Sequence, residues 1–317
     1  MSVLVVGADI GGTSTRAAVA TTDGQVLAIA SGGPGSPVGV GLERSAAQIR
    51  AVVDRALAGT EGAVRAYVLG LAGGSQARDD AAFAETIRPD RLEVSGQLVS
   101  DLVVAFASAT PAEAGYVLIG GTGAVAGRVE GAEITAWADG LGWLLGDAGS
   151  GFWLGREAVR QTLLALQRGA ELTPLNRDVV SLAGTDDYSR LVGLCYAERP
   201  TALGRYAPLV SARAGDSPDA AAIVAEAAQA MTATLLGLDP SPGMPIVLAG
   251  SLLTSASPVA GLVRRELAER PNPVLTATHG ALGACWLALR SLGIDDVEIH
   301  ARLNESVGTA GAAQLTG

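Results

Sequence analysis

The chain opens on a short apolar run that ends in a glycine turn, and this turn constrains the fold more than any other feature. Residues 4–7 are apolar, Asp9 follows, and a Gly-Gly-Thr turn at 11–13 leads into alternating polar and apolar residues. The alternation predicts a returning β-strand, so the glycines form a hairpin turn. Glycines let backbone N–H groups approach anionic oxygens, and an aspartate can hold a hydrated divalent cation. The segment is therefore predicted to bind nucleotide phosphate.

The chain contains no lysine, because all 22 of its basic side chains are arginine. The phosphate-binding loop of P-loop proteins needs a lysine before its Ser or Thr, and protein kinases need a strand lysine, so both schemes are excluded. Backbone amides, hydroxyl groups and magnesium remain as ligands of phosphate. Arg16 is a further candidate, although its place on the strand after the turn suits a surface role equally well.

Composition narrows the function classes further. At 317 residues with a net charge of −10, the chain suggests two domains and argues against nucleic acid as a partner. Cys195 and Cys285 are far apart and lack the spacing of a zinc or iron–sulfur site. Asp9 interrupts the first apolar segment too early for a signal peptide, and no uncharged run is long enough to cross a bilayer. We therefore expect a cytoplasmic protein without a membrane partner.

The same order of elements occurs twice. A second strand and glycine turn, with Gly-Gly-Thr-Gly at 120–123, begin at Tyr116, and a mainly helical insertion is expected over 151–238. The duplication predicts two like-folded domains, 1–114 and 115–295, that face each other across a cleft, with nucleotide phosphate between the two hairpins. The expected strands are 4–9, 17–22, 26–31, 67–71, 97–99, 117–119, 124–128, 133–137, 246–249 and 274–276, and the expected helices outside the insertion are 42–57, 77–87, 102–108, 258–268 and 281–289.

The most specific segment is residues 140–156, with the sequence GLGWLLGDAGSGFWLGR. It resembles the GWxxGDEGSGxWxG signature of the N-acetylglucosamine kinase family, also described as BadF/BadG/BcrA/BcrD-type ATPases, within the actin, sugar kinase and Hsp70 ATPase superfamily. The resemblance extends over essentially the whole chain. It implies an α/β protein with two ribonuclease H-like domains, the actin-like ATPase fold, around a nucleotide and sugar cleft, and we expect residues 296–317 to pack back on the first domain.

The resemblance also implies roles for individual residues. Asp101 is expected to be the general base and Asp9 to hold Mg²⁺. ATP is expected to contact Gly11, Gly12, Thr13, Thr15, Gly121, Thr122, Gly123, Gly250 and Ser251, and the sugar is expected to contact Ser36, Asp101, Gly146, Asp147 and Ser150. Structural alternatives exist for most of them: Asp101, Asp147 and Ser251 would also serve as helix caps, and Asp9 and the glycines would also serve in ordinary turns.

Four positions depart from the family pattern and bear on the sugar. Ala148 stands where relatives have glutamate, Ser36 stands where an asparagine is common, and Gly120 and Ala124 replace serines beside the second turn. A carboxylate can fix sugar hydroxyls or a 2-amino group by charge-assisted hydrogen bonds, so its loss at position 148 changes specificity. N-acetylglucosamine, glucosamine, N-acetylmuramic acid and other hexoses all remain open.

The leading hypothesis is an ATP-dependent kinase for an amino sugar or N-acetylhexosamine, acting at the 6-hydroxyl and forming a homodimer as the family does. One alternative is an ATPase activator of a radical dehydratase, which would need cluster cysteines that Cys195 and Cys285 do not supply. Another is a sugar-sensing regulator, which would need neither Asp9 nor Asp101. Trp143 and Trp153 are expected in the core, and neither His279 nor His300 is expected to act in catalysis.

Overall fold

The structure is a computed structural model that describes residues 2–73 and 81–305. The chain divides into two compact units. Unit 1 comprises Met1–Gly115, Arg128–Thr135 and Leu275–Gly317, and unit 2 comprises Tyr116–Gly127 and Ala136–Val274. Each unit is described below by itself.

The first sheet has five strands in the order β3-β2-β1-β4-β5. Strand β1 pairs with β2 antiparallel and with β4 parallel, and β4 pairs with β5 parallel. The strands are β1 (Val3–Ile10), β2 (Thr15–Thr21), β3 (Val26–Gly32), β4 (Ala63–Leu71) and β5 (Gln97–Ser100). The first glycine turn therefore joins β1 to β2, as its sequence predicts.

The second sheet repeats this connectivity, with the order β10-β9-β6-β7-β8. Its strands are β6 (Ala114–Gly120), β7 (Ala124–Glu130), β8 (Glu133–Asp139), β9 (Ile246–Ala249) and β10 (Val274–Thr276). In each sheet, the first three strands of the chain segment lie in sequence order, and the next two strands add to the free side of the first one. In the second sheet, β6 therefore pairs with β9, in parallel. The predicted duplication and the α/β fold class are confirmed.

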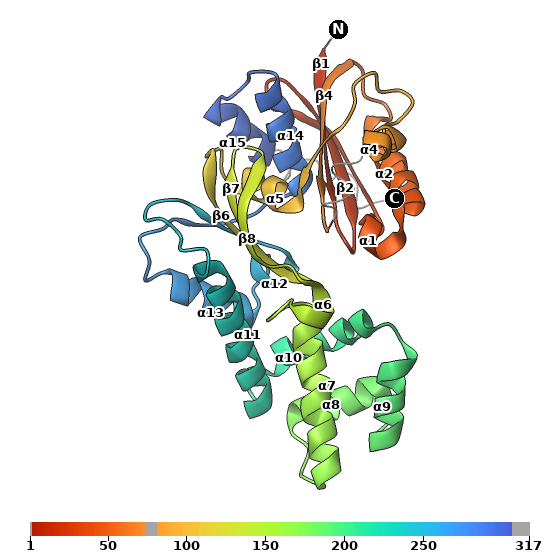
Figure 1. Cartoon of the computed structure of the whole chain (residues 1–317), viewed down its shortest axis with the longest axis vertical. Coiled ribbons are helices and arrows are strands. Elements are labelled where there is room, and N and C mark those ends of the chain that lie inside the picture. The colour runs from red at the N-terminus through yellow and green to blue at the C-terminus, as the bar shows by residue number, and fades with distance from the viewer. Residues whose placement is uncertain (1, 74–80, 306–317) are drawn as a thin grey trace. The chain divides into compact units, whose positions relative to one another are not determined.

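Two layers of helices cover the first sheet. The even positions of β1 from Leu4 to Ile10 form a core with α2 (Leu42–Leu57), because successive strand residues point to opposite faces. On the other face lie α5 (Asp101–Ala109) and α14 (Gly280–Ser291), and Figure 1 shows α2 and α14 on opposite sides of β1 and β4. Two short helices, α1 (Pro37–Val40) and α4 (Ala81–Thr86), complete this part of unit 1.

Helix α14 lies unusually close to its neighbours because glycine occupies both contact points. A Cβ atom on Gly7 of β1 would collide with the backbone of Ala281 and Cys285. A Cβ atom on Gly283 would collide with the backbone of Val104 in α5. This packing places α14 in unit 1, whereas the sequence led us to expect its residues in a second domain ending at 295.

The last described helix, α15 (Val297–Glu305), packs on the same unit. His300 Nε2 donates a hydrogen bond of 2.8 Å to the carbonyl of Ala107, and its ring lies edge-on to Trp286. Arg302 Nε donates to the carbonyl of Asp23 at 2.8 Å. Through residue 305, the C-terminal segment thus returns to unit 1, the place expected for residues 296–317.

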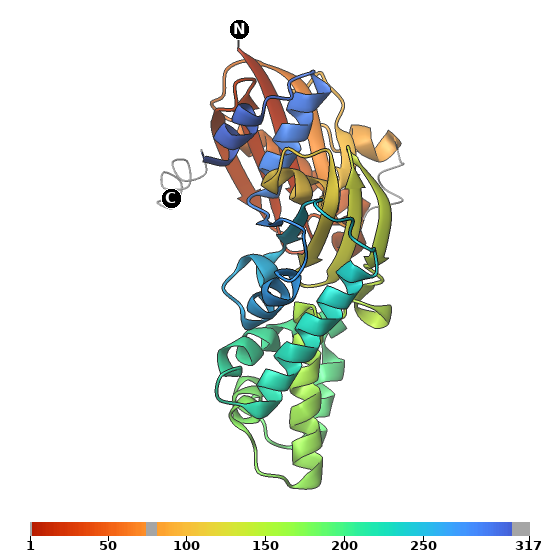
Figure 2. The same ribbon diagram turned by 90° about the vertical axis from the view of Figure 1, so that its left-hand side faces the viewer.

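Unit 2 contains the expected helical insertion. The helices of unit 2 are α6 (Gly142–Leu145), α7 (Gly151–Arg168), α8 (Pro174–Ala183), α9 (Tyr188–Ala197), the 3₁₀ helix η1 (Pro200–Tyr206), α10 (Ala207–Arg213), α11 (Pro218–Leu236), α12 (Ser251–Thr254) and α13 (Pro258–Leu267), and those from α7 to α11 form the insertion. Figure 2 shows α7 and α11 side by side, and both contribute to one apolar core with β6 and β9. In the described part of the chain, no helix combines the length and apolar character needed to cross a membrane.

We predict that Gly7→Ala destabilises the protein by about 2–4 kcal/mol, because the added methyl group must push the backbone of α14 away from β1. The matched control is Gly193→Ala in α9, where a Cβ atom would meet open space and should stabilise the helix by about 0.5–1 kcal/mol. Urea unfolding of both variants measures the difference. Equal stability of the Gly7→Ala variant and the unmodified chain would contradict the close packing.

Candidate functional site

The first glycine turn, residues 11–14, is closed by its own backbone and open toward solvent. The amide of Gly11 donates to the carbonyl of Ser14 at 2.9 Å. Gly12 and Thr13 are exposed, and a Cβ atom on Gly12 would meet no atom within 4 Å. Packing within the protein therefore does not require glycine at this position. A turn that leaves its backbone uncovered is the arrangement that an anionic ligand needs.

A second loop of unit 1 holds this turn in place. The carbonyl of Gly11 accepts hydrogen bonds of 3.1 Å from the amides of both Gly35 and Ser36. The Ser36 hydroxyl donates to the carbonyl of Ala72 at 2.9 Å, and Ser36 is buried. Thr15 is fully buried with its hydroxyl packed against Gly35. In this structure Ser36 and Thr15, predicted to contact sugar and nucleotide, thus anchor and pack the loop.

Asp9 and Asp101 lie at the same edge of the first sheet. Asp9 in β1 is in register with Gly70 in β4, which is in register with Val99 in β5, and Asp101 follows two residues later. The carboxyl ends of these three parallel strands meet there. The sequence therefore brings the two predicted catalytic carboxylates into one unit and to one edge.

Asp101 is not the cap of the helix that it begins. The N-cap of α5 is Ser100, whose hydroxyl accepts a hydrogen bond from the amide of Leu102 at 3.3 Å. The same hydroxyl lies 3.2 Å from Asp101 Oδ1 and donates to it. The helix-capping role that the sequence also allowed for Asp101 is thus filled by its neighbour Ser100.

The electrostatics of Asp9 are strongly perturbed. Burial and the negative charge of Asp101 raise the pKa of Asp9, Arg16 lowers it, and the net pKa is about 6. The carboxylate lies against the first residue of α14, since a Cβ atom on Gly280 would collide with Asp9 Oδ2. The positive end of the helix dipole favours an anion at this place.

The carboxylate of Asp9 fits a magnesium ion that arrives with a nucleotide. In the ranges 2–73 and 81–305, no group of three or more His, Cys, Asp or Glu side chains forms a protein-only metal site. Magnesium typically needs only one or two carboxylates, with phosphate oxygens and waters completing its shell. A cation bound at Asp9 would offset the negative charge of Asp101, which raises the pKa of Asp9.

His279, which the sequence gave no reason to select, lies at the same end of the sheet. It is the N-cap residue of α14, directly before the glycine that contacts Asp9. Within the described residues, its buried Nδ1 atom has no hydrogen-bond partner. Burial and, to a smaller extent, the charge of Arg16 lower the pKa of His279 to about 4, so the imidazole is neutral at pH 7. The sequence around His279, directly before α14, matches none of the motifs that marked the other site residues.

The second glycine turn, residues 121–123, has the same design in unit 2. The amide of Gly121 donates to the carbonyl of Gly123 at 2.9 Å, and Thr122 is exposed. A Cβ atom on Gly121 would again meet no atom within 4 Å. The carbonyls of Gly121 and Thr122 accept the amides of Gly151 and Phe152, the first two residues of α7, at 2.8 and 3.2 Å.

Asp147 contacts this second turn directly. Its Oδ1 atom accepts a hydrogen bond of 2.9 Å from the amide of Ala124, the first residue of β7. A Cβ atom on Gly123 would lie only 2.7 Å from the same oxygen. Burial raises the pKa of Asp147, the hydrogen bond from Ala124 lowers it, and the charge of Asp139 raises it. The sequence also allowed Asp147 to cap the following helix, but Ser150 fills that role. The Ser150 hydroxyl caps α7 by accepting the amide of Trp153 at 3.2 Å.

Asp139 is a second residue that sequence reasoning missed. Its Oδ1 atom accepts from the amide of Asp147 at 2.9 Å, and its Oδ2 atom accepts from the amide of Ala148 at 3.0 Å. Gly146, predicted to contact the sugar, packs against this carboxylate, because a Cβ atom there would collide with Asp139 Oδ1. The signal was present as an aspartate before Gly140, at the end of a predicted strand.

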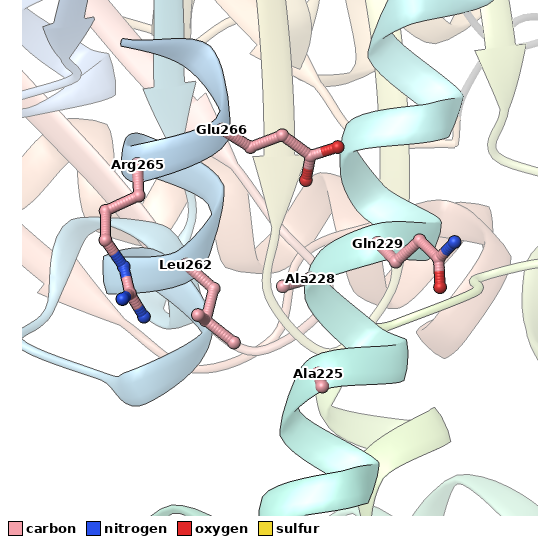
Figure 3. A pocket seen from close by; sticks show the side chains of 6 residues that line it. All are labelled: Ala225, Ala228, Gln229, Leu262, Arg265 and Glu266. Carbon is pink, nitrogen blue, oxygen red and sulfur yellow. The ribbon is translucent and has the colours of Figure 1, made fainter. Parts of the chain in front are cut away.

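The predicted adenosine residues lie beside the second turn. Gly250 has φ +81°, and a Cβ atom on it would collide with the backbone of Gly120, so the protein itself requires glycine there. Ser251 is exposed and begins α12. A separate hollow of about 410 Å³ lies between α11 and α13 (Figure 3), and no predicted site residue lines it.

Comparison with known proteins identifies the family. The model of the BadF/BadG/BcrA/BcrD ATPase family matches residues 6–288. The chain belongs to this ATPase family. Two curated relatives of this BadF-type chain are sugar kinases. An N-acetylmuramic acid/N-acetylglucosamine kinase from Clostridium acetobutylicum is 25% identical over 197 residues, 61% of this chain and 64% of that kinase. An N-acetyl-D-glucosamine kinase from Dictyostelium discoideum is 24% identical over 318 residues, 91% of this chain and 98% of that kinase.

A solved structure supports the same placement. A Chromobacterium violaceum protein described as a candidate N-acetylglucosamine kinase is similar to the BadF-type chain with a TM-score of 0.75 and 26% identity. The match covers 90% of this chain and 98% of that protein. The resemblance to the N-acetylglucosamine kinase branch and the actin-like ATPase fold are both confirmed.

We predict that Asp9→Asn stabilises the magnesium-free protein at neutral pH. The pKa of Asp9 is about 6 in the native state against an ordinary value of 3.8, so the native state binds more protons between these pH values. The free energy of unfolding therefore falls as pH rises from about 4 to 6, and the charged Asp9 destabilises the fold above that window. The variant should gain about 1–3 kcal/mol at pH 7.5 and nothing at pH 3.5.

Urea unfolding in EDTA at both pH values measures this gain. The Asp101→Asn background is the control, because removing the charge that raises the pKa of Asp9 should shrink the gain from Asp9→Asn. A gain of the same size at pH 3.5 and pH 7.5 would show that the effect does not come from the charge of Asp9.

Proposed function

We propose that the protein is an ATP-dependent kinase of an amino sugar or N-acetylhexosamine, with N-acetylglucosamine and glucosamine as the first candidates. The observation that carries this proposal is the pair of open glycine turns, one in each unit, together with Asp9 and Asp101 at one edge of the first sheet. Backbone amides in such turns suit phosphate, and carboxylates suit a magnesium ion and a general base. The relatives that match the chain are sugar kinases.

In this proposal Asp101 accepts the proton of the attacking sugar hydroxyl, the 6-hydroxyl by family resemblance, as the bond to phosphorus forms. Phosphoryl transfer is catalysed mainly by positioning and by stabilisation of charge, with a carboxylate that orients the nucleophile. Asp101 suits this role because Ser100 already caps α5. The Ser100 hydroxyl donates to one carboxylate oxygen, which fixes the orientation of the group.

The donor in this proposal is magnesium ATP. The amides of Gly11 and Gly121 close their own turns, so the amides of residues 12–13 and 122–123 would contact its phosphates, with Gly250 and Ser251 on the adenosine side. Asp9 and its coordinated waters would hold the Mg²⁺ ion, which neutralises phosphate charge when bound. Arg16, which already interacts with Asp9, adds a positive charge at this edge.

The sugar in this proposal contacts the loop that contains Gly146 and Asp147. Position 148, where relatives carry glutamate, offers no carboxylate in this chain, so Asp147 supplies the charged acceptor among residues 146–148. One carboxylate instead of two favours a neutral 2-acetamido group over a protonated 2-amino group. By resemblance to the family, we also propose that the kinase is a cytoplasmic homodimer.

The cysteines argue against the alternative of an ATPase activator with an iron–sulfur cluster. Cys285 is fully buried in α14, its thiol donates to the carbonyl of Ala18 at 3.5 Å, and burial raises its pKa to about 12. A ligand of iron must be a thiolate, and such a thiol stays protonated. Cys195, partly buried in α9, also has a raised pKa.

We predict that Asp101→Asn lowers kcat by about 10²–10⁴ while the Kd for magnesium ATP changes less than about twofold. The amide cannot accept the proton of the hydroxyl, yet it keeps the size of the side chain. Asp296→Asn, which alters a carboxylate that accepts the amide of Glu298 on the surface, is the control and should keep full kcat. Normal turnover by the Asp101→Asn variant would eliminate it as the base.

We predict that ADP release with magnesium and ATP depends on the sugar. The panel is glucosamine, N-acetylglucosamine, N-acetylmuramic acid, N-acetylmannosamine and glucose, and N-acetylglucosamine should give the highest kcat/KM because the loop lacks the second carboxylate. A flat response to all five sugars, with measurable ATP binding, would instead favour a sugar-sensing regulator.

A further inference from the structure

Asp139 organises the loop that carries Asp147 through three backbone amides. Its Oδ2 atom accepts from Ala148, and its Oδ1 atom accepts from Asp147 and, at 3.4 Å, from Leu141. Amides that bond to a carboxylate form charge-assisted hydrogen bonds, which are stronger than neutral ones. One side chain at the end of β8 thus fixes both ends of the turn that follows it.

The same loop is linked onward to the second glycine turn. While the backbone amide of Asp147 bonds to Asp139, its side chain accepts the amide of Ala124 at 2.9 Å and occupies the space beside Gly123. Two carboxylates in series therefore connect the end of β8 to the start of β7. We call these two residues and their amide partners the aspartate relay, comprising Asp139, Asp147, Ala148 and Ala124.

The relay holds a backbone that would not adopt this shape by itself. Asp139 has φ +59° and Asp147 has φ +57°, in the left-handed region that non-glycine residues rarely occupy. Among the described residues, Asp239 is the only other non-glycine residue with positive φ. Two such residues in one loop persist only when the surrounding hydrogen bonds over-determine them, and such strain gathers at functional sites.

We propose that Asp139 is a positioning residue that couples the sugar-side loop, residues 146–148, to the phosphate-side turn, residues 121–123. Asp139 itself touches neither ligand; it fixes Asp147, and Asp147 fixes the start of β7. The proposal rests on the proposed kinase function, which assigns sugar to the first segment and nucleotide phosphate to the second. Loss of Asp139 should therefore weaken the binding of both the sugar and the nucleotide, although these ligands contact different segments.

The test compares Asp139→Ala with Asp139→Gly. Both remove the carboxylate, but glycine also relieves the positive φ, so it should lower the thermal midpoint by fewer degrees than alanine does. If Asp139 positions the relay, both variants should raise KM for ATP and KM for the sugar about tenfold or more. The Kd for magnesium ADP, measured by calorimetry, should rise by a similar factor.

The matched control is Asp187→Ala. This aspartate caps α9 in the same unit through the amide of Arg190 at 2.8 Å, so its loss removes a carboxylate–amide bond of the same kind outside the relay. It should lower the thermal midpoint by a few degrees and leave every KM and the nucleotide Kd unchanged. Gly146→Ala supplies a second approach to the relay, because its methyl group displaces the Asp139 carboxylate without removing it.

Two outcomes would overturn the proposal. One is an Asp139→Gly variant with unchanged KM values, which would make Asp139 a structural cap like Asp187. The other is a KM that rises for only one of the two ligands, which would show that the segments are not coupled. If the unmodified chain releases no ADP with any sugar, the proposed function fails, and the nucleotide Kd of the two Asp139 variants then decides the relay by itself.

Discussion

The backbone contact between β1 and α14 is the constraint on which the first half of the site depends. Because Gly7 has no side chain, α14 lies directly on the strand, and strand periodicity places Asp9 on the same face two residues later. Gly280 then allows the Asp9 carboxylate to lie against the start of the helix. A helix formed by residues 280–291 thus helps to bury Asp9, and burial is the largest cause of its raised pKa.

Different hydrogen bonds stabilise the two glycine turns. In unit 1 the carbonyl of Gly11 accepts two amides from the loop at 35–36, and in unit 2 the carbonyls of Gly121 and Thr122 accept the first amides of α7. Unit 2 adds the carboxylate of Asp147. The duplication therefore preserved the strand order and the open turn, while each half acquired its own support.

Local sequence patterns predicted most of the fold. Strands such as 246–249 and 274–276 match the structure, because apolar runs bounded by turn residues specify them locally. The placement of α14 was not predictable in this way, since it depends on contacts of Gly7 and Gly283 with residues distant in sequence. The expected helix at 77–87 is described only from residue 81, as α4, and its earlier residues lie outside the described ranges.

The sequence predicted the residue types of the candidate site better than it predicted the contact that each residue makes. The motifs located both turns and both units' aspartates, but a motif does not say which atom a side chain contacts. Ser150 caps α7, Ser36 anchors a loop and Thr15 is buried, and only the three-dimensional structure shows these contacts. Asp139 was missed because it lies just before the glycine-rich segment at 140–156 and matches no motif position, although it ends β8, which leads to the site.

The hydrogen bonds at the first glycine of each turn have a thermodynamic consequence. Since the carbonyls of Gly11 and Gly121 are already bonded, the adjacent peptide planes cannot flip freely in the absence of a ligand. A loop that must order itself on binding loses conformational entropy, which reduces affinity and slows association. These turns are rigid in advance, so a phosphate group that reaches them meets amides already in place, and the entropy lost on binding comes mainly from the ligand.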